Sequence, residues 1–160
     1  MEILIRDYRE DDSGQVLALV RELQAHEKVF FDRMRDAADI GPWYLEALQS
    51  ACADGRGRVL VATRGGDILA YACVLTDQSS AEERDEVPYR YALVQDLVVT
   101  KAARGQGLGR RLLTACEAIA RAAGVRWLRI SHLADNRGAG EAYKSFGFQN
   151  LLIEMEKSLD

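Results

Sequence analysis

The sequence has few of the residues on which metal sites and disulfide frameworks depend. It contains three cysteines and two histidines in 160 residues, and no Cys-x-x-Cys pair. Cys52, Cys73 and Cys116 are odd in number and widely separated, which predicts reduced, buried thiols in a reducing compartment. His26 and His132 each lack a second ligand at metal spacing, so no metal site is expected.

Long apolar runs are missing as well. The longest apolar stretches fall far short of the ~20 residues that a membrane helix needs. The N-terminus, MEILIRDYREDD, has no apolar run followed by a small-residue cleavage site. We therefore expect a cytoplasmic protein that does not bind a membrane. With 48% hydrophobic residues, 29% charged residues and only two prolines, the chain is predicted to fold as one domain over residues 1–160.

The charge balance shows no overall excess of positive residues. The net charge is −4, which argues against nucleic acid as the main partner because phosphate binding needs a basic face. Residues 1–100 carry 19 acids and 11 bases, whereas residues 101–160 carry 6 acids and 10 bases. The C-terminal part thus suits an anionic cofactor and the N-terminal part a cation, although a chance distribution over a solvated surface explains the same numbers.

Hydrophobic periodicity predicts helices and strands along nearly the whole chain. Strands are expected at residues 1–8, 58–63, 67–76, 89–100 and 125–132, with one or two more from Phe148 to Ile153 and beyond. Helices are expected from the capping residues Asp11, Asp12 and Ser13 through Leu23, and at 41–53, 108–123 and 136–146. This order predicts an α/β fold with a mixed sheet and helices on both faces.

The most informative segment is Arg104-Gly105-Gln106-Gly107-Leu108-Gly109, between a predicted strand and an amphipathic helix. A helix N-terminus has unpaired N–H groups and the positive end of the helix dipole, so it favours an anion. The absent side chains of glycine let a phosphate approach the backbone. A tight turn between strand and helix would explain the glycines equally well. The spelling fits neither a P-loop, which needs Gly-Lys-Ser/Thr, nor the Gly-x-Gly-x-x-Gly dinucleotide fingerprint.

Two segments together resemble the GNAT acetyltransferases. Arg104–Gly109 is similar to that family's R/Q-x-x-G-x-G/A signature, and Leu97-Val98-Val99 resembles the strand before it. Downstream, Asn136-x-x-Ala139-x-x-x-Tyr143-x-x-x-Gly147-Phe148 looks like the second signature, at the expected spacing. With the order of helices and strands, the resemblance covers residues 1–153. It implies the GNAT fold, with a central mixed, mostly antiparallel sheet of six to seven strands, flanked by four helices and splayed at the cofactor cleft.

The resemblance also implies how acetyl-CoA is held. The strand bearing Leu97–Val99 splays from the next strand, and its backbone binds the pantetheine amides and polarises the acetyl carbonyl. The N–H groups of residues 104–110 hold the pyrophosphate, and Asn136 contacts the pantetheine or stabilises the helix start. The expected cofactor-binding residues are Leu97, Val98, Val99, Arg104, Gly105, Gln106, Gly107, Leu108, Gly109, Arg110, Asn136, Ala139 and Tyr143.

Tyr143 and Asp96 are the predicted catalytic residues. Tyr143 shares a helical face with Asn136, and its phenol can protonate a thiolate leaving group; the alternative is a tyrosine that packs against Phe146 and Phe148. Asp96, directly before Leu97, is the candidate base. Adjacent strand residues point to opposite faces, so either Asp96 or Gln95 faces the cleft. A structurally paired carboxylate is an equal alternative for Asp96. Weaker candidates for the base are Glu27, His26, Asp32 and an ordered water.

The acceptor is predicted to be a primary amine of a small molecule. By resemblance, the first two helices and the loop before the central strand shape its pocket. Aromatic and acidic residues there suit a cationic, partly apolar amine: Phe30, Phe31, Asp32, Trp43, Tyr44 and Glu82–Glu86. Taken singly, Trp43 and Tyr44 are explained as helix core and Glu82–Glu86 as a solvated loop. Alternative functions are acetylation of protein lysines or N-termini, and a non-catalytic acyl-CoA-binding module. By analogy with relatives that pair through C-terminal strands, a homodimer is expected.

Overall fold

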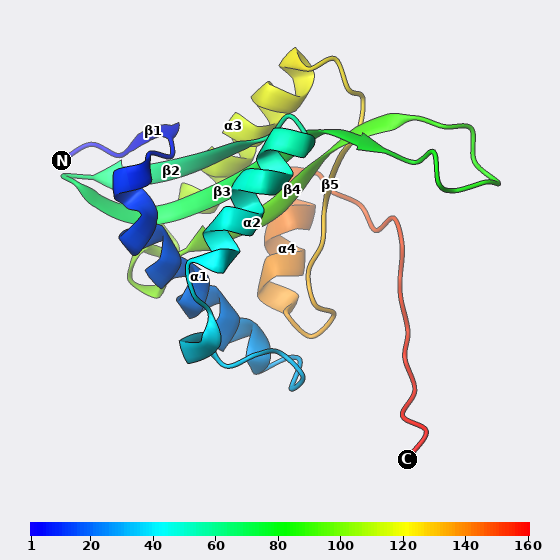
Figure 1. Ribbon diagram of the computed structural model, residues 1–160, viewed down its shortest axis with the longest axis horizontal. Coiled ribbons are helices and arrows are strands. Elements are labelled where there is room, and N and C mark those ends of the chain that lie inside the picture. The colour runs from blue at the N-terminus through cyan, green and yellow to red at the C-terminus, as the bar shows by residue number, and fades with distance from the viewer.

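The computed structural model describes residues 1–160 and contains five strands, in the sheet order β1-β2-β3-β4-β5 (Figure 1). The first four strands pair antiparallel and β5 pairs parallel with β4. The strands are β1 (Leu4–Asp7), β2 (Arg58–Arg64), β3 (Asp67–Ser79), β4 (Arg90–Val99) and β5 (Leu128–Ile130). The helices are α1 (Ser13–Lys28), α2 (Trp43–Asp54), α3 (Leu108–Ala122) and α4 (Arg137–Phe146). The predicted mixed, mostly antiparallel sheet with four helices is confirmed.

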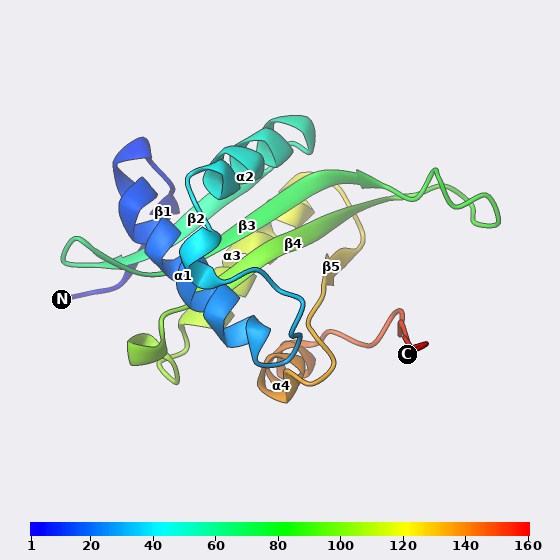
Figure 2. The same ribbon diagram turned by 60° about the horizontal axis from the view of Figure 1, so that its bottom comes forward.

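The sheet has a hydrophobic core on each face, because helices cover both (Figure 2). Tyr71 and Cys73 of β3 pack with α1 and α2. Their neighbours Ala70, Ala72 and Val74 pack with α3. This alternation explains why β3 is apolar almost throughout, since a strand buried on both faces has no solvent side.

Two local predictions have different outcomes. The turn between β2 and β3 contains Gly65 and Gly66 with φ values of 59° and 99°, a left-handed conformation that glycine adopts without steric cost. The predicted capping of α1 is wrong, because no side chain caps its first turn. The Asp12 carboxylate instead accepts hydrogen bonds from the Arg6 guanidinium, at 2.7 and 2.9 Å, and from the Arg9 backbone N–H at 2.7 Å.

The strands predicted at the C-terminus are absent from the structure. The sheet has five strands instead of six to seven, because residues 147–160 form no strand and β5 is limited to Leu128–Ile130. Phe148–Ile153 has strand-forming composition, but a strand needs a partner, and this segment leaves the body of the protein without pairing to β5 (Figure 1). Leu152, Ile153 and Met155 are consequently exposed. None of the helices is both long and apolar enough to span a bilayer.

Candidate active site

The sheet splits between β4 and β5 at a β-bulge. Val74 of β3 pairs with Val94, whereas the preceding Cys73 pairs with Asp96, so Gln95 is an extra residue in β4. The parallel pairing of β4 with β5 covers only residues 92–94. Beyond the bulge, β4 still pairs with β3 but has no strand on its other side. The predicted splay is therefore present at Asp96 and Leu97.

The bulge also determines which side chain faces the α1/α2 side of the sheet. Gln95 is exposed, and Asp96 points toward α2 and β3. The Oδ2 atom of Asp96 accepts a hydrogen bond from the Tyr44 hydroxyl at 3.0 Å and another from the Tyr71 hydroxyl at 2.9 Å. Burial raises the pKa of the Asp96 carboxyl above its usual value, and the two phenols partly oppose that rise.

A second carboxyl group lies near Asp96. Glu27 is on the last turn of α1 and is half-buried. Burial raises the pKa of Glu27, and the negative charge of Asp96 raises it further. The charge of Asp96 thus reaches Glu27, and two acids on this side of the split make the region suited to a cation.

Tyr143 reaches the same region from α4. Its ring makes edge contacts with Phe148, at 6.1 Å between centroids, and with His132, at 6.0 Å. Burial raises the pKa of the Tyr143 phenol to about 12, and the charge of Glu27 adds to this rise. The phenol is therefore protonated at neutral pH and can donate a proton or a hydrogen bond. Tyr143 thus packs against Phe148, as the alternative interpretation predicted, and also lies close enough to Glu27 to feel its charge.

The glycine-rich loop presents a run of free backbone donors at the start of α3. The N–H groups of residues 105–110 have no acceptor within the protein. Gly105 and Gly107 both have a φ of 76°, and a Cβ at either position would meet no atom within 4 Å. The space above these glycines is open to an anion that approaches the backbone. These features fit the pyrophosphate of acetyl-CoA.

The base of this loop is fixed by side chains from α1 and from residues 100–104, which follow β4. Glu22 accepts hydrogen bonds from the Thr100 hydroxyl at 2.8 Å and from the Lys101 N–H at 2.5 Å. The Arg104 Nε donates to the carbonyl of Val99 at 3.1 Å. These hydrogen bonds fix the start of the predicted phosphate loop against the end of the predicted pantetheine-binding strand. Leu97 and Val99 pack on the α3 side, and Val98 packs on the α1/α2 side.

The second signature is explained largely by the geometry of α4. The Asn136 side chain caps this helix by accepting a hydrogen bond from the Ala139 N–H at 3.3 Å. Of the two roles expected for Asn136, the structure therefore contains the stabilised helix start. A Cβ on Gly140 would lie 2.8 Å from the His132 ring, so a larger residue there would require the exposed His132 side chain to move.

Several predicted acceptor residues do not meet at the split. Asp32 is exposed beside Arg33, and Trp43 is 46% exposed at the start of α2, so it is not helix core. The acidic segment Glu82–Glu86 is exposed in the loop between β3 and β4, which projects away from the helices (Figure 1). Its interpretation as a solvated loop fits this position. His26 makes an edge contact with Phe30, 5.2 Å between ring centroids, and burial lowers its pKa.

Sequence reasoning missed Tyr71. It lies in the apolar segment DILAYACVLT and is fully buried, which makes it look like a core residue. One signal was present, because a buried tyrosine hydroxyl usually has a hydrogen-bond partner. Nothing in the sequence shows that this partner is Asp96, because a bulge sets the register between β3 and β4.

Comparison with known proteins agrees with this geometry. The family model described as Acetyltransferase (GNAT) family matches residues 17–148. Thialysine N-epsilon-acetyltransferase from Bos taurus is 29% identical in an alignment 165 residues long, gaps included. The alignment covers 93% of this chain and 85% of that protein.

Two solved structures share the fold. A mutant of the BH1408 protein from Bacillus halodurans superposes with a TM-score of 0.85 at 24% identity, covering 98% of this chain and 99% of that one. AAC(6′)-Iy, in complex with the bisubstrate analogue CoA-S-monomethyl-acetylneamine, superposes with a TM-score of 0.69 at 15% identity, covering 99% of each chain. The family match covers most of the sequence, and the chain therefore belongs to the GNAT family and is an acetyl-CoA-dependent N-acetyltransferase.

Proposed function

We propose that the protein transfers the acetyl group of acetyl-CoA to a primary amine of a small molecule, by direct attack within a ternary complex. The observation that carries this proposal is the Asp96 carboxylate, which two phenols hold at the point where β4 separates from β5. A positioned carboxylate with a raised pKa beside an opening in the sheet is suited to remove a proton from an ammonium group.

On the donor side, acetyl-CoA supplies an activated acetyl thioester. The free N–H groups of residues 105–110 hold its pyrophosphate, and the positive charge of Arg104 and Arg110 adds to the field of the helix N-terminus. The unpaired edge of Leu97–Val99 binds the amides of the pantetheine arm. Ala139, in the first turn of α4, lines the side of the split where the pantetheine arm binds. The Asn136 side chain fixes that turn by its hydrogen bond with the Ala139 N–H.

On the acceptor side, Asp96 takes a proton from the bound ammonium group and so exposes the nitrogen lone pair. Tyr143 donates its phenolic proton to the departing thiolate, and solvent restores it. Glu27 attracts the cationic substrate to the split. Tyr44 and Tyr71 orient Asp96 and limit the rise of its pKa.

The acceptor that we propose first is the side-chain amine of an amino-acid derivative such as thialysine. Its support is the thialysine acetyltransferase from Bos taurus, which this chain resembles over 93% of its length. The paired carboxyls Asp96 and Glu27 suit the same chemistry, because they favour a cationic amine over a neutral one.

The test is release of free CoA thiol against a panel of amines, namely thialysine, lysine, polyamines, aminoglycosides and a lysine peptide. We expect turnover with a small amine and a loss of about 10²-fold in kcat for Tyr143→Phe. Tyr8→Phe is the matched control, because the buried Tyr8 hydroxyl has no hydrogen-bond partner. Turnover of the peptide alone would move the assignment to protein acetylation. Binding of acetyl-CoA without any turnover would favour a non-catalytic module.

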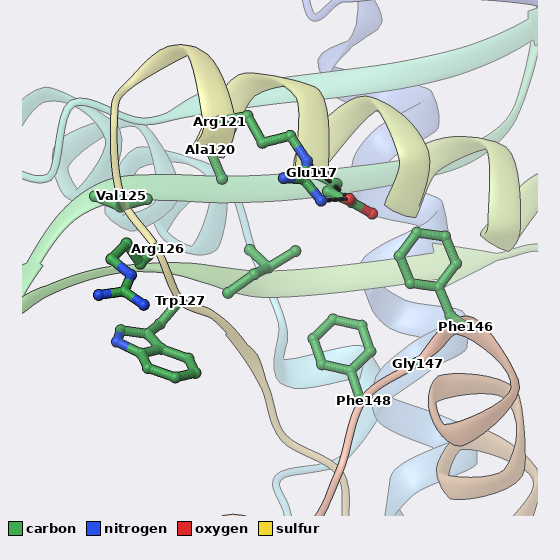
Figure 3. Close-up of a pocket in the computed structure, with 10 residues that line it drawn as sticks. Glu117, Ala120, Arg121, Val125, Arg126, Trp127, Phe146, Gly147 and Phe148 are labelled. Carbon is green, nitrogen blue, oxygen red and sulfur yellow. Dashed lines mark hydrogen bonds and ion pairs between the residues drawn. The ribbon is translucent and has the colours of Figure 1, made fainter.

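We also propose a homodimer that covers the outer side of β5. A groove of about 280 Å³ lies between α3, the start of β5 and the residues at the end of α4, with the aromatic rings of Trp127, Phe146 and Phe148 in its lining (Figure 3). The apolar C-terminal segment, including Leu152 and Ile153, is exposed in the single chain. Burial of these side chains against a second copy removes apolar area from water. We expect twice the monomer mass by light scattering, and the monomer mass for Ile153→Asp; a monomeric native protein would contradict the proposal.

A further inference from the structure

Two of the three cysteines are in contact on the α1/α2 side of the sheet. The Sγ atoms of Cys52, on the last turns of α2, and Cys73, in the middle of β3, are 3.6 Å apart. Cys73 is fully buried, whereas Cys52 is half-buried and so open to a small reagent. A disulfide has an S–S length of about 2.05 Å, so the bond requires the two sulfurs to approach by roughly 1.5 Å.

The third cysteine provides an internal control. Cys116 is buried on α3, in the core on the opposite face of the sheet. Cys73 belongs to the core formed with α1 and α2. The sheet therefore separates Cys116 from the contacting pair.

The contact also distinguishes the roles of the two thiols. The hydrogen bond between the two thiols lowers the pKa of Cys52, and the same bond together with burial raises the pKa of Cys73. Cys52, which is the more exposed, is thus the thiol that ionises first and attacks.

We propose that Cys52 and Cys73 form a reversible disulfide that locks α2 to β3 and slows acetyl transfer. The oxidant is a low-molecular-weight disulfide such as oxidised glutathione. The Cys52 thiolate attacks one of its sulfurs and releases one glutathione thiolate. The Cys73 thiol then loses its proton and attacks the Cys52 sulfur, which releases the second glutathione thiolate. The two cysteines lose two electrons and two protons, and oxidised glutathione becomes two reduced glutathione molecules.

The disulfide would change the position of the Asp96 carboxylate through two of its neighbours, Cys73 and Tyr44. Cys73 is the direct partner of Asp96 in the pairing of β3 with β4. Cys52 is on the same helix as Tyr44, whose hydroxyl bonds to Asp96. A shift of about 1 Å at either position misplaces the carboxylate, and a displacement of that size is enough to slow a reaction by 10-fold or more.

The experiment oxidises the full-length protein with excess glutathione disulfide, blocks the remaining thiols by alkylation, and maps the cysteine peptides by mass spectrometry. We expect a linked Cys52–Cys73 peptide, an alkylated Cys116, and full reversal by dithiothreitol. The melting temperature should rise by about 5 °C or more, because the bond closes residues 52–73 into a loop. Cys116→Ser should behave in the same way, and Cys52→Ser should show neither change.

A stable glutathione adduct on Cys52 without the linked peptide would overturn the proposal, as would oxidation that leaves the melting temperature unchanged. With an acceptor amine, kcat/KM should fall about 10-fold on oxidation and recover on reduction. A linked protein with an unchanged kcat/KM would overturn the effect on catalysis. The peptide map and the melting temperature do not depend on any acetyl-transfer assay, so they test the disulfide even if the proposed acceptor is wrong.

Discussion

The donor side and the acceptor side of the split are built from different parts of the chain. The glycine loop on the donor side consists of consecutive residues whose backbone N–H groups are free, and its shape follows from glycines at positive φ. On the acceptor side, Asp96 of β4 meets Tyr44 of α2, Tyr71 of β3 and the charge of Glu27 from α1. A backbone site therefore leaves a compact sequence motif, whereas a side-chain site assembled from four elements leaves almost none.

The strongest test of this comparison removes the charge on the acceptor side alone. We expect Asp96→Asn to lower kcat/KM for the amine by about 10²- to 10³-fold, because the variant cannot accept the ammonium proton. The dissociation constant of acetyl-CoA, measured by calorimetry, should change less than about twofold because its phosphate contacts are intact. Gln95→Ala changes the exposed neighbour of Asp96 and should retain native activity. An equal loss of kcat/KM in Asp96→Asn and Gln95→Ala would show that activity depends on the backbone bulge and not on the carboxylate.

The converse test changes the donor side. Gly107→Ala places a Cβ in the open space above the loop, and we expect it to weaken acetyl-CoA binding about 10-fold by calorimetry. Gly124→Ala is the matched control, because Gly124 has the same φ of 76° and equal free space but lies after α3. Both variants should lose about 1 kcal/mol of stability through strain at positive φ. If both also weakened binding equally, the loop would have no special role.

A smaller effect is expected when one phenol is removed from Asp96. The hydrogen bond from Tyr71 lowers the pKa of Asp96, so Tyr71→Phe should raise it. The rising limb of kcat/KM should then move to higher pH, so kcat/KM should fall below the native value along that limb. The maximum rate at high pH should stay near the native value. A uniform loss at every pH would indicate misplacement of the carboxylate instead of a change in its pKa.

The smallest effect concerns stability. Because burial raises the pKa of Asp96 in the folded state, its contribution to stability is fully present at low pH and is lost as pH rises through that pKa. Asp96→Asn removes this loss, so we expect the variant to be more stable than the native protein at neutral pH by about 1 kcal/mol. The two proteins should converge at acid pH. Melting curves over a pH series check this, and a less stable variant at neutral pH would contradict the assigned cause.

The sequence was sufficient for the parts of the fold that depend on local pattern. The apolar period of α3 and the glycines at Gly65, Gly66 and Gly107 all predicted the elements that the structure contains. It failed at the C-terminus, where Phe148–Ile153 has strand composition and no partner strand within the chain. It also left the choice between Gln95 and Asp96 open, because a single extra residue in β4 decides which one faces α2.

The pH dependence of kcat/KM for acetyl transfer, compared between the native protein and Asp96→Asn, decides whether Asp96 is the base. The native profile should rise through a pKa above the usual range of an aspartate, set by the burial of Asp96. In Asp96→Asn this limb should disappear, and the rate should instead follow the ionisation of the free amine near its own high pKa. The same limb in both proteins would show that Asp96 is not the base.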